Sequence, residues 1–482
     1  MLPRPGDLQG CPWSRLAYAY GIVLALGFVY FIVRMPYQVS DDLEHLLVMQ
    51  FQSYRGLVED SLTGDGSLRP LQWMQQKALF QLAPGGAYWD TFKAFHALQL
   101  VVLIALFVRL LRVRTAADLT ALPLALAALL GMHTFNVTMR EAYPVNHFMT
   151  ILVCCLAVAN LALARPAWWR DAAAVVIFAY ALLTLETGLL VWVCMVAVYL
   201  ARWRGLSWRA LAGATAVLVA YLVVRFLVLD VGARGLAAMS SGYGFSVRGT
   251  GDLENLFGDA PWKFYLYNIV SSVLTVLFSE PRAGVFQFMS FIARGDVPPW
   301  SMVNVTVSVI GTTIIAVHIV RRMLAVRRGA ELEHTDGLLL LFLAVLGGNA
   351  VISYPYTKDV IVSPAGMFYA AALFVAVRSL LEPARVRTLG VAVALIVPLL
   401  IVSTGWTLRA AGLVASMRAT AFVNRGDWAV ADEYLQHNRP EWRERHPDAE
   451  RLFFALQDDV IRRPVPQLYE TPRWTRRWFD PY

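Results

Sequence analysis

Long apolar runs alternate with short polar segments along most of this chain. The first run, residues 17–33, holds no charged side chain and is long enough to cross the hydrocarbon core of a bilayer. The pattern predicts membrane-spanning helices at 17–33, 96–111, 119–137, 147–164, 172–185, 187–201, 210–229, 300–320, 337–353, 361–379 and 388–405. We therefore expect an all-α, polytopic membrane protein of about eleven transmembrane helices.

Two stretches leave alternatives open. Glu186-Thr187-Gly188 interrupts residues 172–201, which indicates two short helices that meet at a shallow turn. Residues 262–293 are apolar and aromatic but contain Pro and Gly breaks, and they predict either a hairpin or interfacial helices.

The polar segments predict how the chain divides. Residues 1–405 form the transmembrane module, and within it residues 34–95 form a long first outer loop with amphipathic stretches. Such stretches are typical of helices that lie in the plane of the membrane surface. Residues 406–482 are expected to form a small helical C-terminal tail outside the membrane, with a basic and aromatic end suited to lipid headgroups.

Composition supports the membrane assignment. The chain is 58% hydrophobic and only 16% charged, whereas soluble domains carry about 25% charged residues. The net charge is +8, but the basic residues sit in short clusters between apolar runs, which excludes nucleic acid as the partner and points to membrane lipids. The four cysteines form no CxxC pair, so neither a disulfide framework nor a zinc site is indicated.

The basic clusters also predict the orientation. They follow every second run, at Arg109/Arg112/Arg114, Arg165/Arg170, Arg202/Arg204/Arg209, Arg321/Arg322/Arg327/Arg328 and Arg378/Arg385/Arg387. By the positive-inside rule the N-terminus is cytoplasmic and the C-terminus lies outside. Frequent Ala, Arg, Leu and Val with scarce Lys favours a bacterium with GC-rich DNA, and hence its plasma (inner) membrane.

An acidic cluster follows the first run. Asp41 and Asp42 stand in the sequence Ser-Asp-Asp-Leu-Glu-His, close to the predicted outer surface. There they could act as a catalytic base or, with His45, as ligands of a divalent metal. The structural alternative is that Ser40 or one of the acids caps an interfacial helix, in which case His45 is a solvated helix residue.

Several other polar residues lie on the same predicted side. Arg69 precedes a Pro and could bind a phosphate, or its side chain could simply extend to the membrane–water interface. Arg140, Glu141 and His147 make the second outer turn unusually polar, although Arg140–Glu141 could be a plain ion pair. Glu186 is flanked by apolar residues, where a carboxylate is costly unless it meets water, a partner or a cavity.

The remaining candidates are Phe95-His96, at the start of the second predicted span, and the late outer turn with Tyr356 and Lys358. A single His at a helix start is more often structural. Lys358 could bind phosphate as a point charge, or it could pair with the neighbouring Asp359.

Taken in order, these segments resemble the GT-C superfamily of polytopic glycosyltransferases, and most of all the branch of protein O-mannosyltransferases and tetratricopeptide-bearing mannosyltransferases. The resemblance spans roughly residues 15–380. Its motifs are Asp41-Asp42, Arg69-Pro70-Leu71, Phe95-His96, Leu185-Glu186-Thr187-Gly188 and Lys358-Asp359 followed by Ser363-Pro364-Ala365-Gly366. His133-Thr134 stands where the branch has His-Pro, and Glu141 substitutes for a Glu that follows it.

The resemblance implies inverting transfer of a sugar from a polyprenyl-phosphate donor to a hydroxyl of a lipid, glycan or protein acceptor at the outer face. Asp41 or Asp42 would be the catalytic base. The implied substrate-binding set is Arg69, His96, Arg140, Glu141, His147, Glu186, Tyr356 and Lys358. A divalent metal stays open as a cofactor. The rival classes are a transporter or lipid flippase, and a non-enzymatic membrane scaffold.

Overall fold

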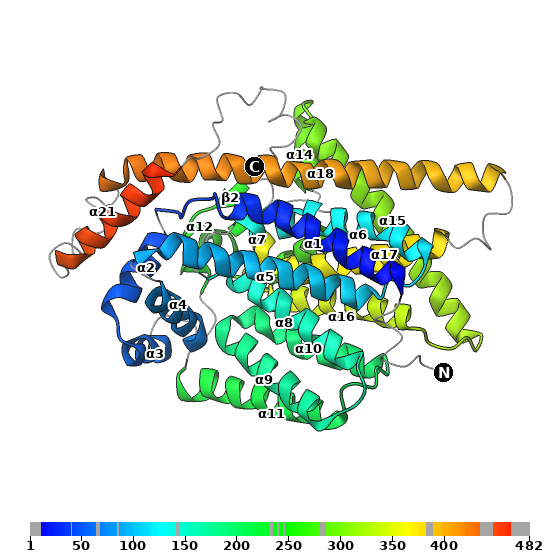
Figure 1. The fold of residues 1–482 in the computed structure, drawn as a ribbon, viewed down its shortest axis with the longest axis horizontal. Helices are drawn as coiled ribbons and strands as arrows, with labels where there is room; N and C mark the ends of the chain where they lie inside the picture. The colour runs from blue at the N-terminus through cyan, green and yellow to red at the C-terminus, as the bar shows by residue number, and fades with distance from the viewer. Residues whose placement is uncertain are drawn as a thin grey trace.

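The computed structural model describes residues 11–39, 41–63, 68–83, 86–140, 145–230, 235–238, 241–243, 246–278, 286–381, 389–433 and 447–463. Helices make up nearly all of this part of the chain, which confirms the all-α prediction (Figure 1). The described strands are two short segments, β1 (Ser241–Tyr243) and β2 (Ser246–Arg248), which pair as an antiparallel hairpin.

The first half of the chain runs from α1 through α11. Its helices are α1 (Pro12–Ile32), α2 (Asp41–Phe51), α3 (Tyr54–Thr63), α4 (Pro70–Leu82), α5 (Tyr88–Leu111), α6 (Ala116–Gly131), α7 (His133–Arg140), α8 (His147–Ala162), α9 (Trp168–Thr184), the 3-10 turn η3 (Glu186–Gly188), α10 (Leu189–Leu200) and α11 (Trp208–Val223), which continues as the π-helical segment η4 (Val224–Val228).

The second half begins with short elements and ends with long helices. They are η5 (Leu236–Ala238), α12 (Asp252–Phe257), α13 (Pro261–Phe278), α14 (Phe286–Arg294), α15 (Pro299–Arg327), α16 (His334–Ile352), η6 (Asp359–Val362), α17 (Ser363–Leu381), α18 (Leu389–Ala429) and α21 (Pro447–Arg462). The open alternative for 262–293 thus becomes two helices, α13 and α14, on either side of a segment outside the described residues.

Fewer helices qualify as full membrane spans than the eleven apolar runs suggested. Within the described residues, seven are long and apolar enough to cross a bilayer, or eight if the bent pair α6–α7 is one span. The shortfall has a physical cause, since α9 has 17 residues and α10 has 12, whereas a crossing needs about 20. The predicted break at Glu186-Thr187-Gly188 is present, and it separates these two short helices.

The last long helix also differs from the prediction. α18 has 41 residues and runs without interruption through the boundary expected at 405–406. At about 1.5 Å per residue it is some 60 Å long, twice the thickness of the hydrocarbon core. In Figure 1 it extends along the whole upper edge of the bundle. Residues 406–429 therefore continue a helix.

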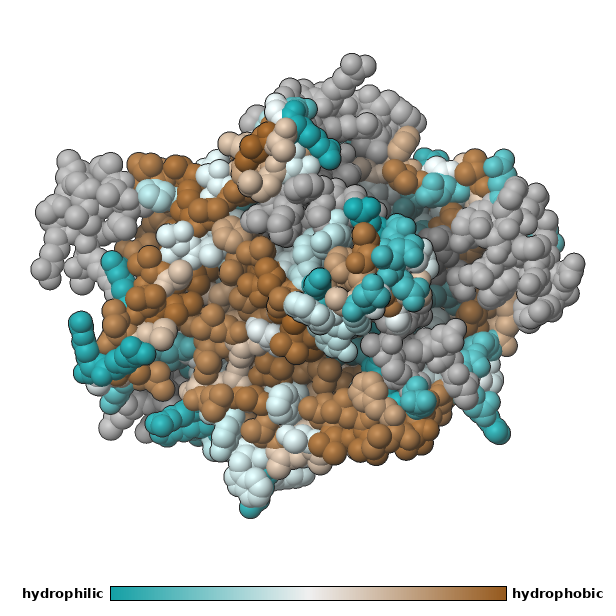
Figure 2. All heavy atoms as spheres, turned by 180° about the vertical axis from the view of Figure 1, so that it is seen from behind, coloured by the Kyte–Doolittle hydropathy of each residue, from teal (hydrophilic) through white to brown (hydrophobic). Residues whose placement is uncertain are grey.

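Apolar side chains cover much of the outer surface. In Figure 2 they form a broad brown area across the middle of one face, with polar residues toward its margins. Helix α11 is an extreme case, because only 11% of its membrane-length window is buried inside the protein. Leu227 and Val228 near its end are 79% and 68% exposed. Such a surface is suited to lipid and not to water.

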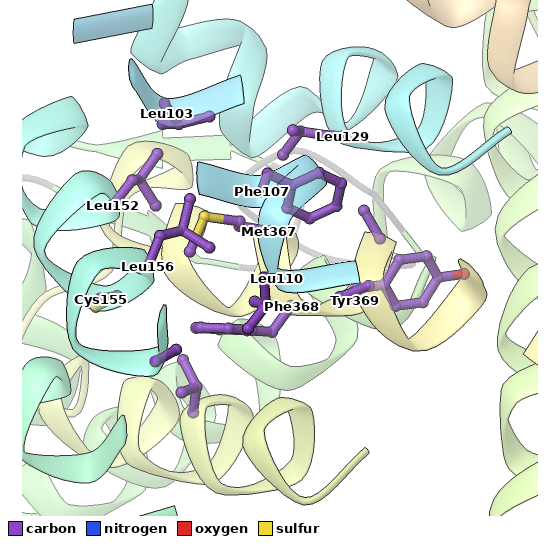
Figure 3. Close-up of a cluster of buried hydrophobic side chains, with 14 of the residues drawn as sticks. Leu103, Phe107, Leu110, Leu129, Leu152, Cys155, Leu156, Met367, Phe368 and Tyr369 are labelled. Carbon is purple, nitrogen blue, oxygen red and sulfur yellow. The ribbon is translucent and has the colours of Figure 1, made fainter. Parts of the chain in front are cut away.

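Helix α17 lies at the centre of the bundle. Of its membrane-length window, 94% is buried, and α6, α15 and α16 pack around it. In Figure 3, Phe107 of α5, Leu156 of α8 and Met367 and Phe368 of α17 converge on one apolar cluster. This packing fixes the helices whose ends carry the polar residues discussed below.

The basic clusters gather at one end of the bundle. The guanidinium of Arg112 donates to the carbonyl of Leu163 at 3.0 Å, and Arg378 pairs with Asp118 at 2.5 Å. His334 lies 3.1 Å from the carbonyl of Leu110. We call this the basic end. Helices α2, α3 and α4 lie at the other end, as Figure 1 shows.

The opposite end has a hydrophobic core of its own. It joins the first loop to the C-terminal segment through Tyr37, Val39, Leu43, Leu46, Leu47, Trp89, Phe92, Trp428, Ala431, Leu452, Phe453, Leu456 and Val460. The indole N–H of Trp428 donates to the carbonyl of Tyr37 at 3.0 Å, and Asn424 donates to the carbonyl of Pro36 at 2.9 Å. The end of α18 and α21 thus hold the chain that leads into α2.

The arrangement predicts opposite accessibility for the two ends. Arg55 of α3, in the first loop, is 88% exposed, and Glu331 is exposed at the basic end. In a background without the native cysteines, Arg55→Cys should react with a membrane-impermeant maleimide in intact cells. Glu331→Cys should react only after permeabilisation, because the basic end should face the cytoplasm. Labelling in the reverse order would contradict the predicted orientation.

Trp428 is expected to stabilise the second core strongly. Its side chain is fully buried, so Trp428→Ala should destabilise α2 and α21 by about 3–5 kcal/mol. Trp428→Phe should cost about 1 kcal/mol, because it loses mainly the hydrogen bond to Tyr37. Hydrogen exchange of the amides in α2 and α21 measures both effects. Val430→Ala, at a side chain that is 58% exposed, is the matched control and should leave the exchange unchanged.

Candidate functional site

Helix α2 carries the acidic pair. It begins at Asp41, so both acids stand in its first turn. The side chains of Asp41 and Asp42 and the whole of Ser40 lie outside the described residues. His45 is one turn further along, with its ring centroid 4.7 Å from that of Trp73 on α4.

Arg69 is the residue immediately before α4. Pro70 starts that helix, where a missing N–H costs nothing. The backbone N–H of Arg69 donates to the hydroxyl of Ser61 at 3.0 Å, which attaches the start of α4 to the end of α3. The side chain is 32% exposed, so its guanidinium remains within reach of a ligand.

Glu186 lies in the turn between two short helices. The helices α9 and α10 have 17 and 12 residues, fewer than the about 20 that a crossing needs, so we expect the turn between them to lie deeper in the membrane than the ends of the long helices. Gly188 makes the turn feasible, since any Cβ at this position would collide with the backbone of Ala181. The break in the apolar run thus sets a carboxylate between two short helices.

Two guanidinium groups hold this carboxylate. Arg69 donates from Nε at 2.6 Å and from Nη2 at 2.5 Å to the same oxygen, Oε2. Arg225 donates from Nη1 to the other oxygen, Oε1, at 3.3 Å. Two positive charges and one negative charge leave this triad with a net charge of +1. The Nη1 group of Arg69 has no partner within the part of the chain that is described.

Arg225 was not among the predicted site residues. It is the one charged residue in the apolar run 210–229, and that isolation was a signal of the same kind as the one that singled out Glu186. The helix is π-helical at residues 224–228, and such segments are frequent at functional sites. Arg225 also donates to the hydroxyl of Tyr221 at 2.9 Å.

A set of neutral polar side chains adjoins the triad. Gln76 on α4 lies 2.8 Å from Nε2 of His147, the first residue of α8. Arg69 and His45 are both close enough to His147 to interact with it electrostatically. Gln75 donates to the hydroxyl of Thr184 at 2.9 Å and ties α4 to the end of α9. Four predicted residues, His45, Arg69, His147 and Glu186, are therefore neighbours.

The surroundings of His96 indicate a structural role. It lies two turns inside α5, since this helix begins at Tyr88 and not at residue 96. The ring is buried, and its Nε2 is 3.1 Å from the amide of Asn146. Asn146 in turn caps α8, accepting from the N–H of Met149 at 2.9 Å. Through Asn146, His96 orients the helix whose first residue is His147.

Tyr356 and Lys358 lie in a different group of contacts. Tyr356 packs against an aromatic cluster formed by α12, α13 and η5, and Nζ of Lys358 is 5.4 Å from the centre of the Tyr356 ring. The carboxylate of Asp359 is 3.8 Å from Nε2 of His133. No described contact joins Lys358 to Arg69 or Glu186, so one pocket for the first loop and the late turn remains a prediction.

The structure tests two other predictions only in part, the polar turn at Arg140–Glu141 and the metal site. Arg140 is the last residue of α7, and Glu141 lies outside the described residues. Among the side chains that are described, no three of the types His, Cys, Asp and Glu gather closely enough to hold a metal ion. The metal that Asp41, Asp42 and His45 could bind therefore stays a prediction.

Comparison with known proteins adds no assignment: no family model, no curated protein and no solved structure matches this chain. The chemical interpretation of the site therefore rests on the geometry of the triad and of the polar side chains around it. A net positive pair of guanidinium groups next to neutral hydrogen-bonding side chains is suited to an anion that bears an uncharged polar group.

The triad makes a prediction about stability. Glu186→Gln leaves two guanidinium groups facing each other, which should destabilise the protein by up to about 3–5 kcal/mol, the cost of breaking a buried ion pair. The loss should fall below that limit because the side chain of Glu186 is 20% exposed. Arg225→Gln should cost less, since Arg69 still neutralises Glu186.

Thermal unfolding of the purified protein measures these differences. Glu59→Gln is the matched control, because Glu59 pairs with Arg55 at 2.7 Å on an exposed helix face. An exposed pair of this kind contributes about 0.5 kcal/mol. Equal unfolding temperatures for Glu186→Gln and Glu59→Gln would show that the triad does not stabilise the fold.

Proposed function

We propose that this protein transfers a sugar from a polyprenyl-phosphate donor to an acceptor hydroxyl at the membrane surface opposite the basic end. The observation that carries the proposal is the location of the Arg69–Glu186–Arg225 triad. It combines a net positive charge with a position at the end of α11, where Arg225 lies in a helix of which only 11% of the membrane-length window is buried. A phosphate attached to a lipid tail requires both features together.

The triad would act on the leaving group. As the bond between the anomeric carbon and the phosphate oxygen breaks, negative charge develops on the lipid phosphate. Arg69 is the proposed ligand of that charge, because its Nη1 group retains hydrogen-bonding capacity and the side chain is 32% exposed. Arg225 would hold Glu186 and keep Arg69 oriented.

The proposed base is Asp41, with Asp42 orienting it; because α2 begins at Asp41, Asp42 lies inside the helix and is not its N-cap. Position 41 is one helical turn before His45, so the two positions share a face of α2. His45 contacts α4 beside Arg69, whereas position 42 is turned by about 100° from that direction. The base would take the proton of the acceptor hydroxyl as the hydroxyl oxygen attacks the anomeric carbon, which inverts the configuration of that carbon.

Transfer assays on the purified protein test this function. Asp41→Asn should lower turnover by about 10²–10⁴-fold, the usual contribution of a general base, while donor binding is retained. Arg69→Ala should weaken donor binding. Asp60→Asn, at an exposed acid of α3 that accepts from Gln52 at 2.7 Å, is the control. Wild-type rates for both Asp41→Asn and Asp42→Asn would rule out the acid pair, and lipid movement without sugar transfer would favour a flippase.

A further inference from the structure

We propose that two loops at the basic end form a binding site for the headgroup of an anionic phospholipid. The loops are residues 163–171 and 201–209, which lead into α9 and α11, and we call them the paired loops. The proposal does not depend on the function proposed above. It is carried by the positive charge, the uncapped helix end and the exposed tryptophans that the two loops bring together.

Hydrogen bonds hold the paired loops against each other. The carboxylate of Asp171 accepts from the backbone N–H of Ser207 at 2.9 Å and from its hydroxyl at 2.6 Å. The N–H of Gly205 donates to the carbonyl of Ala162 at 2.8 Å, and a Cβ at position 205 would collide with that carbonyl. Helices α9 and α11 then lie side by side along the lower edge of Figure 1. The starts of the two helices therefore adjoin.

The paired loops carry a concentrated positive charge. Their charged residues are Arg165, Arg170, Arg202, Arg204, Arg209 and Asp171, which gives a net charge of +4. Both loops are described in full, and none of the five arginines forms an ion pair with another described residue. Four of the five are exposed, and Arg170 is half-buried. An unbalanced cluster of arginines at a membrane surface attracts anionic lipids.

The start of α9 offers a place for the phosphate itself. The residue before the helix is Ala167, so no side chain caps the first turn, and its free N–H groups favour an anion. The guanidinium carbon of Arg170, in the same turn, lies 4.9 Å from the centre of the Trp169 ring. Nη1 of Arg170 is buried and has no hydrogen-bond partner in the described part of the chain. A phosphate oxygen would supply the missing acceptor.

Exposed tryptophans indicate that the ligand is a lipid and not a soluble anion. Trp168 is 81% exposed, Trp169 49% and Trp208 63%. Tryptophan is enriched where lipid headgroups meet the hydrocarbon core. The membrane-length window of α11, which begins at Trp208, is only 11% buried. A phospholipid can therefore place its headgroup on the paired loops and its acyl chains along α11, whereas free phosphate would leave this apolar surface uncovered.

Native mass spectrometry of the full chain, released from nanodiscs of mixed lipids, measures the site. The probes are phosphatidylglycerol, which is anionic, and phosphatidylcholine, which has no net charge. The wild type should retain phosphatidylglycerol in preference. Arg170→Gln and Arg204→Gln should each lower this preference about fivefold, the contribution of one interfacial arginine. Arg204→Lys should retain the preference because it retains the charge, and Trp168→Ala should weaken both lipids alike.

Arg328→Gln is the matched control. Arg328 is an exposed arginine at the end of α15, a helix that packs against α17 and α18. Its replacement should leave the lipid preference unchanged. Equal losses for Arg328→Gln and Arg204→Gln would show a general basic surface and overturn the site. Displacement of phosphatidylglycerol by inorganic phosphate at matched ionic strength would show a site for a soluble anion, and a wild type without lipid preference would also contradict the proposal.

Discussion

The carboxylate of Glu186 is the charge on which the arrangement of the candidate site depends. It lies in an apolar segment and needs a cationic partner. Arg69 and Arg225 meet that need by binding its two oxygens, one from the first loop and one from the π-helical segment that continues α11. The same contacts attach α4 to the turn between α9 and α10, so the position of the first loop on the bundle is set by an ion-pair network as well as by packing.

Local patterns in the sequence predicted the helices and the interruption at Glu186. They did not predict contacts between residues far apart in the chain. The apolar runs located the membrane-length helices, and the break at Glu186 was visible because Gly and a charged residue interrupt an apolar run. Arg225 escaped notice because its pairing with Glu186 spans 39 positions and depends on a π-helical segment that no periodicity reveals.

Helix α18 shows the same limit. Polar residues after position 405 suggested that the apolar run had ended and that a separate tail began. In the structure these residues find partners on other elements: Arg409 donates to the carbonyl of Gly131 at 2.9 Å and to Ser308 at 3.0 Å. Asn424 reaches the carbonyl of Pro36 at 2.9 Å. A polar residue can remain inside a helix wherever tertiary structure satisfies it, and a single sequence does not show where that happens.

The depth of the triad connects these features to chemistry on a lipid. A polyprenyl tail leaves the bilayer at a cost of about 0.8 kcal/mol for each CH₂ exposed to water, so its phosphate must be bound near the hydrocarbon boundary. In the proposed function the short helices α9 and α10 would hold Glu186 near that depth, and Arg225 would reach it from the end of a largely exposed helix. In the proposed reaction an acceptor hydroxyl would arrive from the aqueous side, where we expect α2 and the second core to lie. The C-terminal segment holds the chain that leads into α2 through Trp428, so it would fix the proposed base relative to a donor that the membrane keeps in place.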